Sequence, residues 1–315
     1  MPPRLRYLQF FPTFRCNLAC GFCFNRGIAQ RGESDPGQFE RLIDVMSGSG
    51  IPELDLLGGE PTLLSHLSEC ISRAVAQGIT VNISTNGSNV ALLNRLAGSF
   101  PRDKLRIGLS LNDDDVTDSL AIFIKAHRPV LKTVCMRDRA MPYALDRYMR
   151  LPRTEFYLIF MDAMRKDDLD YSISYPEYRR LMREMQQQYP NAHEVVCSGF
   201  LPDIEHYPEL AGTRCPAGTT KLAIMPDGSA YPCYLFFRNP EFRLGNILSD
   251  PFEFILENPL LDYFRTFHGN PCTDASCEYH GGCHGGCPAV SLLVTGDIAA
   301  PDPRCRTRST GRAKR

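Results

Sequence analysis

The sequence predicts an α/β fold, with a parallel sheet and covering helices in the first part of the chain and a Cys-rich, loop-rich region after it. Up to about residue 160, short apolar segments alternate with amphipathic segments whose apolar residues recur every three or four positions. Repeated strand-then-helix units imply parallel strands joined by right-handed crossovers. From Cys197 onward Gly, Pro and Cys dominate and the apolar periodicity fades. This later region needs something besides an apolar core, and metal is the obvious candidate.

Six strands and six helices are expected from these segments. The expected strands are Tyr7–Phe11, Glu53–Leu57, Thr80–Ser84, Leu105–Ser110, Val130–Cys135 and Phe156–Phe160. The expected helices are about 36–48, 64–77, 89–98, 114–127 and 142–150, and then Pro176–Gln188, which ends before Pro190. Six strands are fewer than a closed eightfold barrel requires.

Composition narrows the class of protein. The 315 residues carry 35 Lys and Arg against 36 Asp and Glu, so the net charge of -1 gives no field that favours nucleic acid or acidic lipid. There is no export signal at Met1 and no long apolar run that would cross a bilayer. Thirteen Cys residues without an export signal indicate metal binding rather than disulfides. We therefore expect a soluble, cytoplasmic protein.

Three cysteines, Cys16, Cys20 and Cys23, directly follow the first expected strand. They can converge on one metal centre only if this segment is a loop. Zinc sites and iron–sulfur clusters that are held by protein alone take four ligands. Here no further Cys or His follows until His66. Three thiolates on a four-iron cluster leave one iron open for a group that is not protein. A zinc loop or a chance grouping of cysteines is the alternative.

The CxxxCxxC spacing, with an aromatic residue before the last Cys, resembles the signature of the radical S-adenosylmethionine (radical SAM) superfamily. The resemblance implies that Cys16, Cys20 and Cys23 hold a [4Fe–4S] cluster whose open iron is chelated by SAM. It places Phe22 near the adenine. The fold implied is a partial (β/α)6, TIM-like barrel with one side open for substrate. Its active site gathers at the carboxyl ends of the strands, where the Cys loop falls.

The second expected strand ends in Gly58-Gly59-Glu60-Pro61, which is similar to the superfamily motif that binds the amino group of SAM. The glycines let the backbone turn sharply and approach a ligand. A plain strand-to-helix turn is the alternative. Polar residues at the ends of the next two strands are further candidates for SAM contacts, because hydroxyl and amide groups there reach ribose or carboxylate oxygens. These candidates are Ser84, Asn86 and Ser110.

The cysteines of the second half resemble the SPASM extension of this superfamily. Cys215 and Cys233 enclose Gly228 in the CxnGxxxxC pattern, and a quartet and a last isolated Cys follow at Cys272, Cys277, Cys283, Cys287 and Cys305. The first pair of the quartet encloses four residues here, where the family usually has two. Zinc ribbons are the alternative for this region.

The family pattern implies two auxiliary [4Fe–4S] clusters, and so three clusters in all. Three cysteines go to the first auxiliary cluster (Cys215, Cys233, Cys287) and four to the second (Cys272, Cys277, Cys283, Cys305). Either Cys197 supplies the fourth ligand of the first cluster or one iron stays open. Cys70 and Cys135 are expected to be ordinary buried thiols. A surface or supporting role is expected for His280 and His284.

Four parts of the chain follow from these patterns. Residues 1–165 are the expected radical SAM core, 166–196 a helical connector, 197–305 the SPASM-type domain and 306–315 a disordered basic tail. Only about six residues precede the first strand, so we expect no leader-peptide recognition domain there.

The resemblance implies an enzyme that cleaves SAM reductively to a 5′-deoxyadenosyl radical, which removes a hydrogen atom from a substrate carbon. We expect oxidative modification or crosslinking of a peptide or protein, with ferredoxin or flavodoxin as electron donor and a separate protein for peptide recognition. Modification of a small molecule, such as a tetrapyrrole or sugar, is one alternative. A non-enzymatic electron carrier or zinc scaffold is the other. The sequence identifies no catalytic acid or base among the candidates Tyr143, Tyr157, Asp162 and Tyr234.

Overall fold

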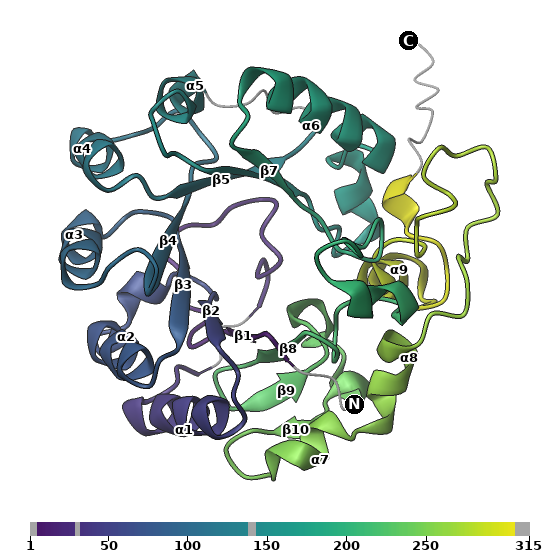
Figure 1. The fold of residues 1–315 in the computed structure, drawn as a ribbon, viewed down its shortest axis with the longest axis horizontal. Helices are drawn as coiled ribbons and strands as arrows, with labels where there is room; N and C mark the ends of the chain where they lie inside the picture. Colours follow the sequence, from purple (N-terminus) through teal and green to yellow (C-terminus); the bar gives the residue numbers. More distant parts are fainter. Residues whose placement is uncertain (1–4, 29–31, 138–142, 306–315) are drawn as a thin grey trace.

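The computed structural model describes residues 5–28, 32–137 and 143–305, with backbone alone at 143 and 144. The expected tail 306–315 lies outside these residues. The strands form one curved sheet, seen end-on in Figure 1 with helices around its outside. The sheet order is β10-β9-β8-β1-β2-β3-β4-β5-β6-β7, and within the described chain no pairing joins β7 to β10. The fold is therefore a partial, open TIM-like barrel.

The first seven strands are parallel neighbours in chain order. Beyond β1 the sheet continues with β8, which is parallel to β1. Two further strands follow, β9 antiparallel to β8 and β10 antiparallel to β9. The strands are β1 (Tyr7–Phe10), β2 (Glu53–Leu56), β3 (Thr80–Thr85), β4 (Leu105–Ser110), β5 (Val130–Cys135), β6 (Phe156–Phe160), β7 (Ala192–Val195), β8 (Lys221–Ile224), β9 (Ser229–Tyr231) and β10 (Gly245–Asn246). The helices are α1 (Pro36–Gly48), α2 (Leu67–Ala76), α3 (Val90–Ser99), α4 (Asp118–His127), α5 (Tyr143–Met149), α6 (Tyr175–Gln188), α7 (Phe252–Leu256), α8 (Asp262–Arg265) and α9 (Pro288–Thr295).

Local signals start the longer helices where the sequence places them. Asp35 and Gln38 form a capping box at the start of α1, and Pro36 occupies its first turn. Ser174 and Glu177 form the same box at α6. The apolar faces of these helices lie against the outer face of the sheet, and the main core lies between the two layers. No described helix combines the length and apolarity that crossing a bilayer requires.

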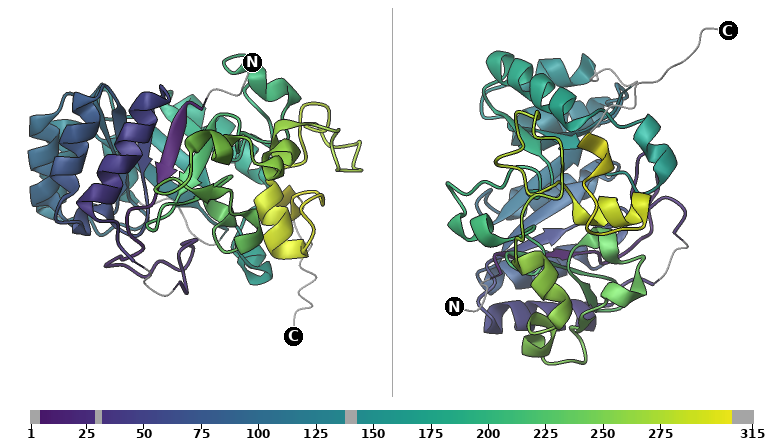
Figure 2. Two further views of the ribbon diagram at one scale, coloured as in Figure 1. Left: turned by 90° about the horizontal axis from the view of Figure 1, so that it is seen from below. Right: turned by 90° about the vertical axis from the view of Figure 1, so that its right-hand side faces the viewer.

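Four strands that the sequence did not predict, β7 to β10, join the sheet. β7 lies inside the segment 166–196 that was interpreted as a helical connector, and its four residues do not alternate in polarity. β8 lies where periodicity fades, yet it is mostly buried and pairs with β1. The C-terminal half therefore begins as part of the barrel sheet. Figure 2 shows its later segments, green to yellow, gathered on one side of the barrel.

The lumen of the barrel carries polar side chains. Successive strand residues point to opposite faces, so the apolar residues of β2 face the helices while Asp55 faces inward. Gln9, Asp55 and Asn82 are register partners across β1, β2 and β3. Asn82 donates a hydrogen bond of 2.9 Å to Asp55. The carboxyl ends of these strands form the rim that holds the candidate site.

Candidate functional site

The segment after β1 folds as a tight loop that contains Cys16, Cys20 and Cys23. The amide of Cys23 donates to the carbonyl of Cys20 over 3.1 Å. The sulfurs of Cys16 and Cys23 accept main-chain amides, from Leu18 and Asn25 respectively, each over 3.4 Å. Burial raises the pKa of Cys23, and the charges of the other two thiols raise it further. The three sulfurs are thus neighbours, and two of them already receive amide donors, as cluster thiolates do.

An arginine from the C-terminal half holds this loop in place. The guanidinium of Arg238 donates to the carbonyls of Phe24 and Arg26 over 2.9 and 2.8 Å. Arg26 in turn donates to the carbonyl of Gly21 over 2.6 Å and pairs with the buried carboxylate of Asp168 over 2.8 Å. The Cys loop is therefore fastened by side chains from both halves of the chain.

Gly58 and Gly59 place the end of β2 directly against the Cys loop. A Cβ at Gly58 would lie 2.4 Å from the carbonyl oxygen of Thr13, and one at Gly59 would lie 2.0 Å from that of Arg15. Only glycine permits this approach, and Gly58 has φ +125 as well. The amide of Gly59 donates to Thr13 and that of Glu60 donates to Arg15, both over 2.8 Å. The two motifs are thus joined backbone to backbone.

Glu60 joins the ends of β2 and β3 through its buried carboxylate. Oε1 accepts the amide and hydroxyl of Thr62, over 3.0 and 2.6 Å, and the hydroxyl of Thr85 over 2.8 Å. Oε2 accepts the amide of Asn86 over 2.7 Å. Oε2 therefore has one donor where Oε1 has three, which leaves Oε2 the oxygen that can accept a further donor. Pro61 begins the short 3-10 turn that follows.

Asn86 extends from the end of β3 to the Cys loop. Its amide nitrogen lies 2.8 Å from Oδ1 of Asn17 and 3.9 Å from the sulfur of Cys16. Phe22 is half-buried within the loop. The neighbouring Phe24 packs inward on an aromatic cluster, with its ring centroid 5.0 Å from that of Tyr234.

Ser84 belongs to a different part of the lumen. Its hydroxyl accepts a hydrogen bond of 2.8 Å from the ammonium of Lys132 on β5. The lysine crosses Gly108 on β4, where a Cβ would lie 2.3 Å from Cε of Lys132. Burial lowers the pKa of Lys132, while the nearby Asp55 raises it. Ser110 is half-buried at the end of β4, in register with Lys132.

Four cysteines of the C-terminal half form one neighbourhood. Cys215, Cys233 and Cys287 are buried and Cys197 is half-buried. A hydrogen bond with Cys197 raises the pKa of Cys287 well above its ordinary value, with burial adding to it. Burial raises the pKa of Cys215 to about 12, and the charge of Cys233 contributes. Cys197 therefore lies with the three thiols that the sequence grouped together.

Lys221, the first residue of β8, lies beside the same thiols. Burial alone would lower the pKa of Lys221, but Tyr7 and then Cys233, Cys197 and Cys215 act in the opposite direction and raise it overall. Tyr7 is its register partner on β1. A half-buried ammonium thus accompanies this group of thiols where the barrel meets the C-terminal half.

The other four cysteines form a second neighbourhood. Burial raises the pKa of Cys283, and the charges of Cys272 and Cys277 contribute in the same direction. Cys305 interacts electrostatically with Cys283 and Cys272. The amide of Gly285 donates to the sulfur of Cys283 over 3.2 Å. This is the set of four thiols that the sequence assigned to one cluster.

Both histidines beside these cysteines are engaged elsewhere. Nε2 of His280 lies 2.9 Å from the carbonyl oxygen of Cys272, and Nδ1 of His284 lies 2.7 Å from another main-chain carbonyl oxygen. The ring of His284 also stacks on Phe267, with centroids 3.8 Å apart. Cys70 and Cys135 are buried away from these groups, as expected.

The thiol groups differ from sites that hold a single metal ion. Among the described residues, no group of three or more His, Cys, Asp or Glu is arranged to hold a single metal ion. A [4Fe–4S] cluster makes a different demand, since each thiolate binds its own iron. The three neighbourhoods, with their amide-to-sulfur hydrogen bonds, fit that donor set.

A polar network connects the two halves near Cys287. The hydroxyl of Tyr234 donates to the carboxylate of Asp162, which also pairs with Arg304 at 3.3 Å. Arg304 is buried and pairs with Asp302 at 2.8 Å. Asp302 accepts the amide of Cys287 over 2.9 Å. The structure thus brings together two of the four candidate acid–base residues.

The other two acid–base candidates do not join this network. Tyr157 is half-buried, with its ring edge against His193, and the side chain of Tyr143 lies outside the described residues. Sequence reasoning missed three charged groups of the interior: Lys132 and Lys221, which are half-buried, and Arg304, which is buried. A lysine inside an otherwise apolar strand, as in β5 and β8, was the available signal for the first two. Nothing local marks Arg304.

Comparisons with known proteins agree with the geometry. A family model described as the radical SAM superfamily matches residues 10–147, and one described as an iron–sulfur cluster-binding domain, SPASM, matches residues 215–288. The chain is 26% identical over 322 residues to the mycofactocin maturase MftC of Mycobacterium tuberculosis, covering 93% of this chain and 81% of that protein. It is 24% identical over 313 residues to the subtilosin biosynthesis protein AlbA of Bacillus subtilis, covering 90% and 67%.

Solved structures show the same fold. Streptococcus suis SuiB bound to S-adenosylmethionine superimposes with a TM-score of 0.72 at 19% identity, covering 96% of this chain and 77% of that chain. SuiB bound to its precursor peptide SuiA has the same TM-score of 0.72 at 18% identity, covering 96% and 76%.

Proposed function

The chain belongs to the radical SAM superfamily and carries a SPASM iron–sulfur domain, and we propose that it is a maturase that modifies a peptide by hydrogen-atom abstraction. When bound, the cluster and SAM supply a 5′-deoxyadenosyl radical, which removes a hydrogen atom from a substrate carbon. The protein binds and orients these groups and excludes other reactants. The following steps concern its own residues.

One observation carries this proposal: the Cys loop and the Gly58–Pro61 segment are hydrogen-bonded backbone to backbone at the carboxyl edge of the sheet. An electron carrier needs thiols but no such cradle beside them. The cradle puts an acceptor for an ammonium, Oε2 of Glu60, next to the loop that would hold the cluster. This pairing favours an enzyme over a carrier or scaffold.

Roles for the residues of the cradle follow from their contacts. Cys16, Cys20 and Cys23 would hold the SAM-binding cluster, and Glu60 with the main chain of Gly58 and Gly59 would receive the amino group of SAM. The remaining candidates, which lie along the same rim, would contact other parts of SAM: Phe22, Pro61, Ser84, Asn86 and Ser110. Because Lys132 already occupies the hydroxyl of Ser84, we propose that Ser84 acts together with Lys132.

Two further clusters are proposed for the C-terminal half, which gives three in all. Cys197, Cys215, Cys233 and Cys287 would hold the first with no open iron. Cys272, Cys277, Cys283 and Cys305 would hold the second. The proximity of Cys197 to Cys287 supports full ligation of the first cluster. Such clusters would accept the electron left on the substrate, which suits a net oxidation.

A peptide substrate is supported by relatives in two separate groups. The mycofactocin maturase matches over most of its length, and the structural neighbour SuiB is described as bound to a precursor peptide. A ferredoxin or flavodoxin would supply the electron, and a separate protein would present the peptide. Because thiolate ligands require a reducing compartment, we propose the cytoplasm as the location.

The test is anaerobic reconstitution of the wild type and of a Cys16→Ala/Cys20→Ala/Cys23→Ala variant, with iron, sulfide and 5′-deoxyadenosine measured. Three clusters give about twelve iron per chain, and loss of one gives about eight. We expect 5′-deoxyadenosine from the wild type alone. Stoichiometric zinc, or iron with no SAM cleavage under reductant, would overturn the enzyme assignment.

A Cys197→Ala variant tests the auxiliary ligands separately. If Cys197 completes the first auxiliary cluster, its loss opens one iron, which then binds added cyanide or imidazole and changes the electron paramagnetic resonance spectrum. An unchanged spectrum would assign Cys197 to a buried thiol beside a cluster that it does not ligate.

A further inference from the structure

A cleft of about 610 Å³ lies at the opposite end of the barrel from the Cys loop. Its lining comes from the ends of α3 and α4 and from the residues around the starts of β4, β5, β6 and β7. The proposed function does not use it. A volume of this size is typical of sites that bind organic ligands and far exceeds that of a single inorganic ion.

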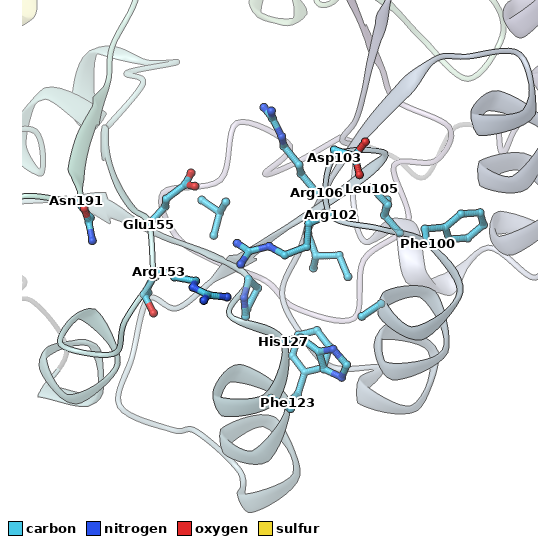
Figure 3. A pocket seen from close by; sticks show the side chains of 16 residues that line it. Phe100, Arg102, Asp103, Leu105, Arg106, Phe123, His127, Arg153, Glu155 and Asn191 are labelled. Carbon is cyan, nitrogen blue, oxygen red and sulfur yellow. The ribbon is translucent and has the colours of Figure 1, made fainter.

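Arginines without partners dominate the polar part of this cleft. The side chains of Arg102 and Arg153 extend toward each other from opposite sides (Figure 3). Neither they nor Arg106 donates a hydrogen bond or forms an ion pair with any described residue. Asp103 and Glu155 also line the cleft, but Figure 3 shows their carboxylates directed away from the arginine pair. Both arginines are exposed, so water screens their mutual repulsion, and an anion between them would accept hydrogen bonds from both guanidinium groups.

The segment that carries Arg153 has an unusual backbone. Arg153 has φ 62, which is unfavourable for a residue with a side chain. The following Thr154 is only 1% exposed, and its Oγ1 has no hydrogen-bond partner. This hydroxyl has no surface that a molecule in the cleft could reach, so it belongs to the protein interior behind the cleft wall. Strained backbone of the kind seen at Arg153 occurs preferentially at binding sites.

The rest of the lining restricts the kind of anion. Phe100, Phe123 and Val130 are among several apolar residues on the cleft wall. A bare phosphate or sulfate would leave this apolar surface unused. The arginines are exposed on their outer side, so the cleft opens to solvent and can admit an extended chain. Carboxylates alternating with apolar side chains would match both kinds of surface.

The cleft is also connected to the proposed reaction site by an edge strand. Asn191, at the cleft, directly precedes β7, and β7 is the last strand of the sheet among the described residues. β7 ends two residues before Cys197. Four strand residues span about 13 Å. An extended peptide of several residues could therefore lie in the cleft at one end and reach the carboxyl side of the barrel at the other.

We propose that this cleft binds an acidic, partly apolar segment of the peptide substrate, remote from the residue that is modified. This inference rests on the proposed function for its peptide, but it concerns a separate surface. It assigns to Arg102 and Arg153 the recognition of carboxylates.

Binding is measured by fluorescence anisotropy with the reconstituted protein and two labelled probes, Glu-Leu-Glu-Phe-Glu and Lys-Leu-Lys-Phe-Lys. An Arg102→Gln/Arg153→Gln variant should bind the acidic probe about tenfold more weakly, or worse, since charge-assisted hydrogen bonds are lost. The matched control is Arg41→Gln/Arg180→Gln, which removes two exposed arginines outside the cleft. The control should bind like the wild type, and the basic probe should bind to none of them.

Equal affinity in the cleft variant and the wild type, or equal binding of both probes, would overturn the proposal. Inorganic phosphate and ATP are titrated in parallel. Tight binding of either, with no binding of the acidic probe, would assign the cleft to a small anion and also overturn it.

Thr154→Val is a control within the cleft wall. Because the hydroxyl is unpaired and has no surface that the probe can reach, its replacement by an isosteric methyl should raise the thermal midpoint of the free protein and leave the affinity for the acidic probe unchanged. Weaker probe binding by this variant would contradict the assignment of recognition to the two arginines.

SAM cleavage without peptide distinguishes the two proposals. It should be the same in the cleft variants and the wild type, because the cleft lies away from the Cys loop. Probe binding by a protein that cleaves no SAM would leave the cleft assignment standing and remove the proposed reaction.

Discussion

Gly59 has no room for a side chain, because a Cβ there would lie 2.0 Å from the carbonyl oxygen of Arg15 and 2.7 Å from the carbonyl carbon of Phe14. A Gly59→Ala variant must push the Cys loop away from the end of β2. We expect SAM affinity to fall about tenfold or more, because the amino group of SAM and the open iron would no longer lie at a fixed separation. Equilibrium binding of SAM to the reconstituted protein measures this.

Gly98→Ala is the matched control. Gly98 lies within α3, and a Cβ there meets nothing within 4 Å. That change should stabilise the protein by about 0.5–1 kcal/mol and leave SAM binding intact. If Gly59→Ala bound SAM as the wild type does, the backbone cradle would not be part of the SAM site.

Lys221 places a half-buried positive charge beside Cys197, Cys215 and Cys233. A cation near a cluster favours the reduced state, so Lys221→Met should lower the reduction potential of the first auxiliary cluster. One unit charge at about 6 Å with an effective dielectric constant near 20 corresponds to a shift on the order of 100 mV. A redox titration followed by electron paramagnetic resonance measures it.

Lys221→Arg keeps the charge and should restore most of the potential. Lys166→Met removes an exposed lysine and should change nothing. A potential that is equal in Lys221→Met and the wild type would mean that Lys221 compensates no cluster charge.

The inward-facing residues Gln9, Asp55 and Asn82 of β1, β2 and β3 include one carboxyl group, and its burial lowers the free energy of unfolding. Burial raises the pKa of Asp55 above its ordinary value, against the hydrogen bond from Asn82 that lowers it. An acid whose pKa is raised on folding destabilises the folded state at every pH above that pKa, by about 1.4 kcal/mol per pKa unit. The penalty disappears as the pH falls below the unfolded value near 4.

Asp55→Asn keeps the acceptor for Asn82 and mimics the neutral acid. The variant should therefore melt at a higher temperature than the wild type at pH 7, and its advantage should shrink as the pH falls toward 4. Melting curves of Asp55→Asn and the wild type at several pH values measure this difference. Asp44→Asn, on the exposed face of α1, is the control. A lower melting temperature at pH 7 would show that the carboxylate stabilises the barrel instead.

Elements whose signals are local were predicted well. The expected bounds agree with the observed ones for β4, β5, β6 and α1. Alternating polarity, apolar runs and a capping box each depend on residues that are close together in the sequence. β7 and β8 were missed, since their strand character comes from pairing with β6 and β1, far away in the chain. A segment of four residues is too short for its polarity pattern to indicate such a partner strand.

The site divides in the same way. The thiols and the glycine motif could be grouped before the structure was known, because their spacing resembles family signatures; their roles as ligands stay predictions. The residues that hold these motifs in place could not be predicted from the sequence. Arg238, Arg304 and Lys221 act across contacts that only the folded chain creates, and many surface arginines and lysines look the same in sequence.

Arg238 tests whether the two halves act as one unit. It follows closely after Cys233 of the auxiliary region, yet its guanidinium donates to two carbonyls of the Cys loop. Arg238→Met removes both donors and keeps the apolar stem of the side chain. The SAM-binding cluster should then be lost more readily than the auxiliary ones. With the three clusters proposed above, iron should fall from about twelve toward about eight per chain after desalting, with 5′-deoxyadenosine formation falling in proportion.

Arg243→Met is the control for this change, because Arg243 is exposed and its guanidinium donates a long hydrogen bond of 3.4 Å within its own turn, away from the Cys loop. It should keep all of its iron. Equal loss from all three clusters in Arg238→Met would mean general destabilisation rather than a loosened loop. Full iron and full activity would mean that the Cys loop keeps its shape without help from the C-terminal half. Selective loss would instead show that the auxiliary region helps to build the site at which SAM binds.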